Sequence, residues 1–111
     1  MNEIILNIYL VINDGLISEL RAKSYEIDGN DDEKIKYLKS FAEKDFEYAK
    51  IFDAPTDNYG KKMSYKNFYK LEKQGMQFQL FEQIFEYFQV PDNPLVCITP
   101  VVDGKIIAEK I

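Results

Sequence analysis

Residues 4–23, IILNIYLVINDGLISELRAK, decide how the chain begins to fold. In the first half alternate residues are apolar, which is the period of two expected for a strand with one buried face. Asn13-Asp14-Gly15 is suited to a tight turn, because these residue types tolerate positive φ at low cost. A second alternating run follows, so the stretch predicts an antiparallel β-hairpin. The residues on the expected core face of the first strand are Ile4, Leu6, Ile8, Leu10 and Ile12.

A three-residue turn sets the expected register of this hairpin. On the core face it pairs large side chains of the first strand with smaller ones of the second. The opposite face pairs Tyr9 with Glu19 and Asn7 with Arg21, and this polar face is expected to contact solvent. The predicted core-face pairs are Ile12 with Leu16, Leu10 with Ser18, Ile8 with Leu20, and Leu6 with Ala22.

The next predicted element is an amphipathic helix that begins after Asn30 and continues to about residue 52. Asn30 is suited to cap this helix, and Glu33 can reach back to complete a capping box. Apolar residues then recur every three or four positions from Ile35 to Phe52. Asp53-Ala54-Pro55 ends the helix, because the residue before a proline resists the α conformation.

Residues 53–63 are predicted to form a loop, and Ser64 is suited to cap a second helix. Gly75 either interrupts or ends that helix, and two helices separated near Gly75 are the favoured interpretation. A series of phenylalanines at helical spacing is interpreted as part of the core. The alternative is that some of these rings form an association surface together with Tyr87. The series is Phe78, Phe81, Phe85 and Phe88.

Residues 95–111 predict a second β-hairpin that turns at Asp103-Gly104. Pro100 has no N–H to donate, so its strand is expected to be a sheet edge or to be bulged there. Both faces of this hairpin carry apolar residues, which implies that the chain itself or a partner covers the second face. We therefore expect a single α+β domain over residues 1–111, with the order ββααββ. The two hairpins are expected to form one antiparallel sheet with two or three helices packed on one face, and the strand order stays open.

The composition argues against catalysis. The 111 residues include no histidine, no tryptophan and one cysteine, and the formal net charge is −5. Histidine, paired cysteines and clustered carboxylates carry most acid–base and metal chemistry near neutral pH. We therefore expect no enzymatic activity, no catalytic residue, no metal and no cofactor. The sequence shows neither a signal-peptide pattern nor a membrane-spanning apolar run, so a cytoplasmic protein without a membrane partner is expected.

Two short features have an ordinary structural interpretation. Cys97 lies in the apolar run 95–98 and is interpreted as a small buried hydrophobe. Asp28-x-Asn30-x-Asp32 resembles the start of a calcium-binding loop. Glu33 stands where that loop needs glycine, and Lys39 stands where it needs glutamate. A capped helix start is therefore the favoured interpretation of this acidic segment.

The leading functional hypothesis is a non-enzymatic protein-binding module. Small acidic domains rich in Phe and Tyr are consistent with inhibitors, immunity proteins and phage-encoded antagonists, which occlude a surface of a macromolecular partner. An acidic cluster suits a basic surface on that partner, with aromatic side chains as anchors. The predicted partner-binding residues are Glu26, Asp28, Asp31, Asp32 and Glu33.

Two alternative functions belong to other classes. Residues 59–73 interleave lysines with aromatic rings, as a surface for single-stranded nucleic acid does, although the acidic net charge favours a solvated helix face. The other alternative is a homodimer, or a larger structural homo-oligomer, built on the C-terminal hairpin. The predicted nucleic-acid-binding residues are Tyr59, Lys61, Lys62, Tyr65, Lys66, Tyr69 and Lys70.

Overall fold

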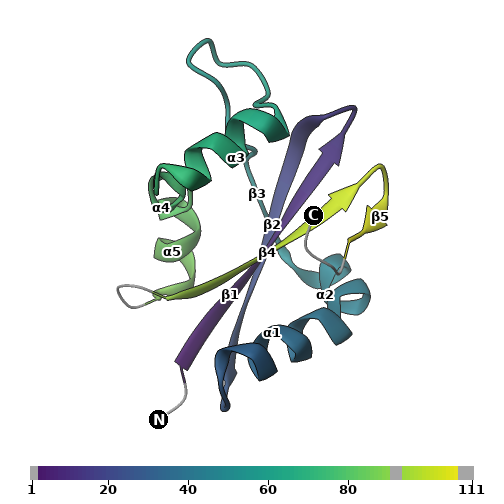
Figure 1. Ribbon diagram of the computed structural model, residues 1–111, viewed down its shortest axis with the longest axis vertical. Helices are drawn as coiled ribbons and strands as arrows, with labels where there is room; N and C mark the ends of the chain where they lie inside the picture. Colours follow the sequence, from purple (N-terminus) through teal and green to yellow (C-terminus); the bar gives the residue numbers. More distant parts are fainter. Residues whose placement is uncertain (1–2, 91–93, 108–111) are drawn as a thin grey trace.

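The computed structural model describes residues 3–90 and 94–107, and strand β1 (Glu3–Asn13) lies at its centre. On one side β1 pairs antiparallel with β2 (Leu16–Ile27), and on the other it pairs parallel with β4 (Leu95–Val102). The short strands β3 (Lys50–Phe52) and β5 (Lys105–Ile106) complete a sheet of order β3-β2-β1-β4-β5 (Figure 1). The α+β class and the union of both hairpins in one sheet are confirmed. The sheet is mixed, because the hairpins meet through a parallel pair of strands.

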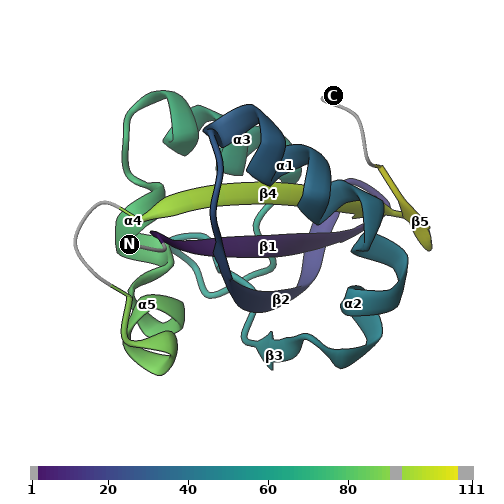
Figure 2. The same cartoon turned by 90° about the horizontal axis from the view of Figure 1, so that it is seen from below.

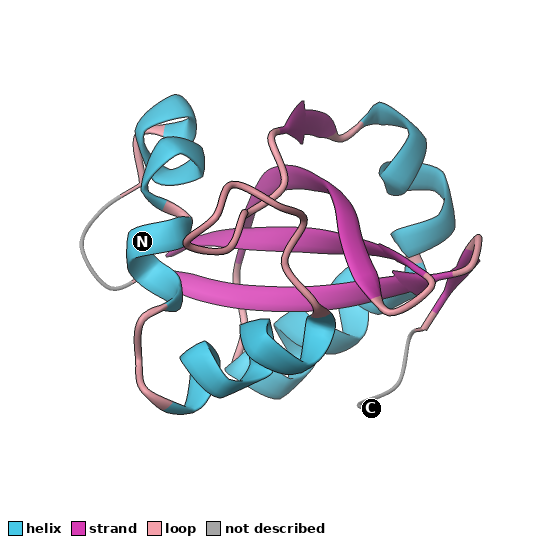
Figure 3. Ribbon diagram, turned by 90° about the horizontal axis from the view of Figure 1, so that it is seen from above, coloured by secondary structure: helices cyan, strands magenta, loops and turns pink. Residues whose placement is uncertain are grey.

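Helices cover both faces of this sheet, which corrects the expectation of one covered face. α1 (Asp31–Ser40) and α2 (Ala42–Tyr48) lie on one side of the strands. α3 (Tyr65–Lys73), α4 (Gln77–Leu80) and α5 (Glu82–Phe88) lie on the other (Figures 1 and 2). Seen from above, helices lie on several sides of the strands (Figure 3). None of the helices within the described ranges is both long and apolar enough to cross a lipid bilayer.

The two faces of β1 explain why both sides need a cover. Its even-numbered residues, such as Leu6 and Ile8, join the core cluster that includes Phe68 and Phe81 of the α3–α5 side. Its odd-numbered residues Ile5 and Tyr9 join the clusters formed with α1 and α2. A central strand buried on both faces is expected to be an almost continuous apolar run, and residues 4–12 are apolar at every position except Asn7.

The expectation of a solvated polar face on the first hairpin is therefore wrong. Asn7 and Tyr9 are both completely buried. The Thr99 hydroxyl donates to Asn7 Oδ1 at 2.9 Å, and the Tyr9 hydroxyl faces the Ala42 carbonyl oxygen at 3.5 Å. The Asn7 oxygen and the Tyr9 hydroxyl thus have partners in the interior, whereas the Asn7 side-chain nitrogen is buried without a partner among the described residues.

The register of the first hairpin also differs from the prediction, by one residue at Ile12, which pairs with Ile17 instead of Leu16, and by two residues from Leu10 onwards. Asp14 and Gly15 alone form the turn, with φ of 52° and 75°, so Asn13 pairs with Leu16. A register shift between Val11 and Ile12 then places Leu10 opposite Leu20. A bulge of this kind adds one residue to one strand, which pattern alone does not reveal. The predicted partners Ser18 of Leu10, Leu20 of Ile8 and Ala22 of Leu6 are thus replaced by Leu20, Ala22 and Ser24.

The first helix starts as predicted but ends earlier. The Asn30 side chain accepts a hydrogen bond from the Glu33 backbone N–H at 2.9 Å, and the capping box is complete. The helix then breaks at Phe41, and α2 ends at Tyr48 instead of residue 52. Residues 50–52 form β3 beside β2, because pairing with the open edge of a strand satisfies their main-chain groups.

The later residues that start, interrupt or turn elements act as predicted. The Ser64 hydroxyl accepts from the Asn67 N–H at 3.2 Å and caps α3. Gly75 takes a φ of 70° between α3 and α4, so the helix is interrupted there. Asp103 and Gly104 form the turn between β4 and β5.

The chain itself covers both faces of β4. Val101 packs in the cluster that includes residues of α2, whereas Ile98 packs against the α3–α5 side. The Ile107 N–H donates to the Pro100 carbonyl at 2.8 Å, on the side of β4 that faces away from β1. Pro100 therefore lies at a position where an N–H group would point away from β1, so the pairing of β4 with β1 loses no hydrogen bond. This is the position expected for a proline at a sheet edge. Residues 108–111 of the predicted return strand lie outside the described residues.

Candidate functional site

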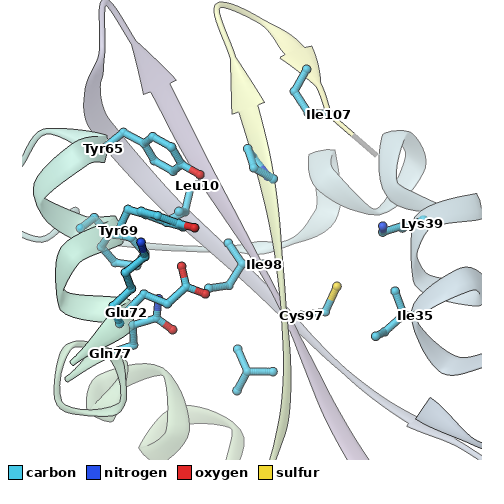
Figure 4. Close-up of a pocket in the computed structure, with 14 residues that line it drawn as sticks. Leu10, Ile35, Lys39, Tyr65, Tyr69, Glu72, Gln77, Cys97, Ile98 and Ile107 are labelled. Carbon is cyan, nitrogen blue, oxygen red and sulfur yellow. The ribbon is translucent and has the colours of Figure 1, made fainter. Parts of the chain in front are cut away.

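A groove of about 600 Å³ follows the outer edge of β4. Side chains of α3 form one wall, side chains of α1 form the other, and β4 forms the floor (Figure 4). This size lies within the range of about 300–1,000 Å³ that is typical of ligand-binding clefts. The groove is therefore the candidate binding site of this protein.

The α3 wall presents two tyrosines one helical turn apart. Their position follows from the sequence, because Ser64 caps the helix and Phe68 anchors its inner face in the core. The ring centres of Tyr65 and Tyr69 are 6.4 Å apart, and Tyr69 is 43% exposed. Burial, the negative charge of Glu72 and the neighbouring Tyr69 raise the pKa of Tyr65, so its hydroxyl stays a neutral hydrogen-bond donor at neutral pH. Two amphipathic rings that turn towards an open groove are well suited to binding a protein chain.

The floor alternates its side chains between the two walls. Ile98 points towards the α3 wall, and Cys97 points towards the α1 wall (Figure 4). Cys97 is 8% exposed, which confirms its interpretation as a small buried hydrophobe. Burial raises the pKa of the Cys97 thiol, so the neutral thiol dominates at neutral pH and the sulfur is a poor nucleophile.

The α1 wall contributes Ile35 and Lys39. These residues are four positions apart, and Asp31 lies four positions before Ile35, so the three share one side of the helix. The α3 wall carries Glu72 and Lys73 along the same groove. Among the described residues, two lysines and one glutamate give the lining a net charge of +1, which contrasts with −5 for the whole chain.

One polar atom in the groove lacks a partner. The side-chain nitrogen of Gln77, at the start of α4, is buried and has no hydrogen-bond acceptor among the described residues. Gln77 also lines the groove. A buried donor without an acceptor is costly, so this atom favours a bound group that carries a carbonyl or carboxylate oxygen.

The structure brings the predicted acidic residues together at one end of the molecule. Glu26 is exposed near the end of β2, Asp28 follows that strand, and Asp31, Asp32 and Glu33 form the first turn of α1. The carboxylate of Glu33 accepts from the Asn30 N–H at 3.3 Å, so the capping interpretation is confirmed. Across residues 3–90 and 94–107, no group of three or more His, Cys, Asp and Glu side chains is arranged to hold a metal ion.

The predicted nucleic-acid residues fall into two groups. Tyr59, Lys61 and Lys62 lie in the loop before α3, where Asp57 Oδ1 accepts from the N–H groups of Tyr59 and Lys61 at 2.9 Å each. The remaining residues lie on α3, with Tyr65 and Tyr69 at the groove. The exposed residues of α3 in this set are Lys66, Tyr69 and Lys70.

The phenylalanine series divides between core and surface. Phe81 is buried, whereas Phe85 and Phe88 are half-buried and pack against the same cluster. Phe78 is 51% exposed and Tyr87 is 57% exposed. The core interpretation is confirmed for Phe81, and an association surface through Phe78 and Tyr87 stays a prediction.

A second cluster of titratable groups lies away from the groove. Asp45 of α2 accepts hydrogen bonds from the Tyr25 hydroxyl and from Lys23 Nζ, the latter at 3.0 Å. Burial alone raises the pKa of Asp45, but the hydrogen bonds from Tyr25 and Lys23 outweigh it and the net pKa is lowered. Burial and the charge of Asp45 raise the pKa of the neighbouring Tyr9 to about 12. None of these four residues lines the groove. The hydrogen bonds of Asp45 connect α2 to strand β2 of the sheet.

The sequence prediction missed the groove, because no single segment contains it. Its lining comes from α1, α3, α4, β1, β4 and Ile107, which are distant in the chain. Pro100 was the one sequence signal of an open strand edge nearby. Comparison of the chain with models of protein families, with curated proteins and with solved structures finds no match.

Proposed function

We propose that this protein is a cytoplasmic, non-enzymatic protein-binding module that acts by occluding a surface of its partner, in the manner of an inhibitor, an immunity protein or a phage-encoded antagonist. The observation that carries the proposal is the groove beside β4, with its exposed aromatic wall and its unpartnered Gln77 donor. Aromatic side chains at a cleft are frequent anchors of protein–protein interfaces.

The acidic cluster adds electrostatic steering to this proposal. Asp31 lies on the same side of α1 as the groove residues Ile35 and Lys39, so the cluster continues the α1 wall beyond the groove. Exposed charges of this kind accelerate encounter with an oppositely charged partner more than they strengthen the final complex. A partner with a basic surface next to the segment that enters the groove fits both features.

Affinity capture from the native host, followed by mass spectrometry, tests the proposal when the baits are matched. Tyr69→Ala removes an exposed ring from the groove, and Tyr48→Ala removes a ring that is 77% exposed elsewhere. We expect one partner that the wild type and Tyr48→Ala retain and that Tyr69→Ala loses. A partner retained equally by all three baits, or turnover of a small compound by the purified protein, contradicts the proposal.

The acidic cluster has its own test with the captured partner. Replacing Asp28, Asp31 and Asp32 together by Asn removes three negative charges near the start of α1. We expect slower association at low salt and little change in dissociation, because rim charges act on the encounter rate. Stopped-flow association rates measured across salt concentrations check this, and unchanged rates remove the cluster from the binding surface.

Single-stranded nucleic acid remains the second candidate ligand. The favouring observation is the exposed side of α3, where Lys73 Nζ lies 5.0 Å from the centre of the Tyr69 ring and Lys66 and Lys70 are exposed. Lysines beside a stacking ring are typical of such surfaces. A gel shift of single-stranded DNA and RNA at low salt, lost in the variant Lys66→Glu/Lys70→Glu, supports this candidate, and no shift excludes it.

Self-association through the C-terminal hairpin also stays a prediction. β5 is the outermost strand of the sheet on that side. Light scattering at high protein concentration tests it, and a monomer contradicts it.

A further inference from the structure

The outer edge of β4 offers main-chain hydrogen-bonding groups that the described residues leave unused. The Pro100 carbonyl accepts from Ile107, and the Asp103 N–H donates to the Ile12 carbonyl of β1 at 2.9 Å. Even-numbered residues of β4 therefore direct their main-chain groups away from β1, because successive residues of a strand alternate. β5 pairs only with Val101 and Val102. The N–H and C=O groups of Val96 and Ile98 thus face the groove without a strand partner in the described part of the chain.

We propose that an extended segment of a partner protein binds in this groove as an additional β-strand, pairing with Val96 and Ile98 beside residues 95–99 of β4. This inference rests on the proposed protein-binding function and names the form in which the partner binds. Addition of a strand to an open sheet edge is an established way for proteins to bind extended peptides, in which main-chain hydrogen bonds give affinity and side-chain pockets give specificity.

The groove matches the side chains of such a strand. Successive side chains of an extended peptide point to opposite faces, so alternate residues would meet the α3 wall and the α1 wall. On the α3 side such a side chain meets Tyr69 and the floor residue Ile98, and on the α1 side it meets Ile35 and the floor residue Cys97. We expect apolar residues at alternate peptide positions.

The charges of the groove point to an acidic peptide. Lys39 and Lys73 stand on opposite walls, and within residues 3–90 and 94–107 Glu72 is the single carboxylate of the lining. A carboxylate of the peptide can pair with Lys39 on one wall or with Lys73 on the other. A carbonyl of the peptide can accept a hydrogen bond from the unpartnered nitrogen of Gln77. An acidic flanking residue is therefore part of the proposed motif.

Other occupants fit the edge less well. A helix satisfies its own main-chain groups, so it would leave those of Val96 and Ile98 unpaired. A second copy of the chain would have to bring its own β4 edge to the strand spacing of about 4.8 Å. That edge lies between side chains of α1 and α3, so the helices of both copies would also have to fit at this spacing, whereas a single extended segment brings no helices.

The test begins with a library of linear nine-residue peptides of random sequence, selected on the full-length protein. We expect enrichment of apolar residues at alternate positions with an acidic neighbour, binding that survives Tyr48→Ala, and at least a tenfold loss with Tyr69→Ala. Methylating the backbone nitrogens of a selected peptide one at a time should weaken binding about tenfold at every second position, because only these N–H groups pair with β4. Amide hydrogen exchange at Val96 and Ile98 should slow when the peptide binds.

Each contrary result has a distinct meaning. Selected peptides with a flat methylation profile and unchanged exchange at Val96 and Ile98 overturn strand addition, while protein binding at the groove survives. A library without enrichment overturns the inference but leaves the capture experiment to decide the proposed function. The chain's own residues 108–111 follow Ile107 directly and are the nearest competitor. Their signature is amide exchange at Val96 and Ile98 that is slow in the free protein and becomes fast in the full-length variant Glu109→Pro. That result would assign the β4 edge to residues 108–111 and overturn the proposal.

Discussion

At the scale of single residues, Asp45 shows how one buried carboxylate joins a helix to the sheet. It lies on α2 and accepts hydrogen bonds from two residues of β2, Tyr25 and Lys23. The Arg21 guanidinium adds a second tie, because it donates to the Phe46 carbonyl at 3.1 Å and lies 4.2 Å from the centre of the Phe46 ring. These contacts hold α2 on the face of the sheet where Tyr9 is buried.

Removing the carboxylate should therefore weaken the fold in a pH-dependent way. The folded-state pKa of Asp45 is lowered, so its contribution is present above the unfolded pKa of about 3.9 and is lost as the pH falls through the folded value. We expect Asp45→Ala to lower the free energy of unfolding by about 1–3 kcal/mol at neutral pH, since it strands the Tyr25 hydroxyl. Urea unfolding at several pH values measures this, and a difference that persists undiminished at the lowest pH contradicts it.

The buried tyrosines predict the opposite dependence at alkaline pH. A neutral tyrosine whose folded pKa is raised stabilises the protein fully below the unfolded pKa of about 10. For Tyr9 this contribution is lost as the pH rises from there through about 12. We expect urea unfolding to show a smaller alkaline loss for Tyr9→Phe than for the wild type. Tyr59→Phe is the matched control, because Tyr59 is 87% exposed and its loss should equal that of the wild type.

At the scale of elements, the start of α1 is set by a local hydrogen-bond pattern. Asn30 and Glu33 satisfy each other's backbone N–H groups, and Gly29 takes a φ of 130° immediately before them. This geometry needs no distant contact. The same sequence pattern is therefore sufficient to predict it.

The cap also yields a quantitative prediction. We expect Asn30→Ala to lower the free energy of unfolding by about 1 kcal/mol, because the Glu33 N–H loses its acceptor. Asn67→Ala is the matched control on α3, where the side chain is exposed and does not cap the helix. Chemical denaturation of both variants checks the prediction, and equal stabilities would contradict it.

At the scale of the whole molecule, the two faces of the sheet are both part of the core. Leu38 of α1 is 1% exposed and packs with Ile5 and Cys97, on the face opposite Phe68. Truncation of either side should therefore be costly.

We expect Leu38→Ala to lower the free energy of unfolding by about 2–5 kcal/mol, as for other buried leucines. Tyr48→Ala, at an exposed position, should stay within about 0.5 kcal/mol of the wild type. Thermal and urea unfolding measure both variants. A Leu38→Ala protein as stable as Tyr48→Ala would contradict the packing of α1 on the sheet.

Local signals account for the parts of this fold that were predicted correctly. The place of the first turn near Gly15, the turn at Asp103-Gly104, the caps Asn30 and Ser64 and the break at Gly75 all depend on the φ or hydrogen-bonding preference of one or two residues. Neighbours along the chain supply everything that these preferences need. These turns, caps and breaks can therefore be predicted from the sequence alone.

The sequence by itself determined the α+β class, the two hairpins, and the starts of α1 and α3, because short-range backbone preferences and apolar periodicity decide them. Only the tertiary structure decided the parallel pairing of β1 with β4, the burial of Asn7 and Tyr9, and the strand β3 that replaced the end of a helix. The groove belongs to this second group. Its walls come from α1 and α3 and its floor from β4, and only the pairing of strands far apart in the chain brings these elements side by side.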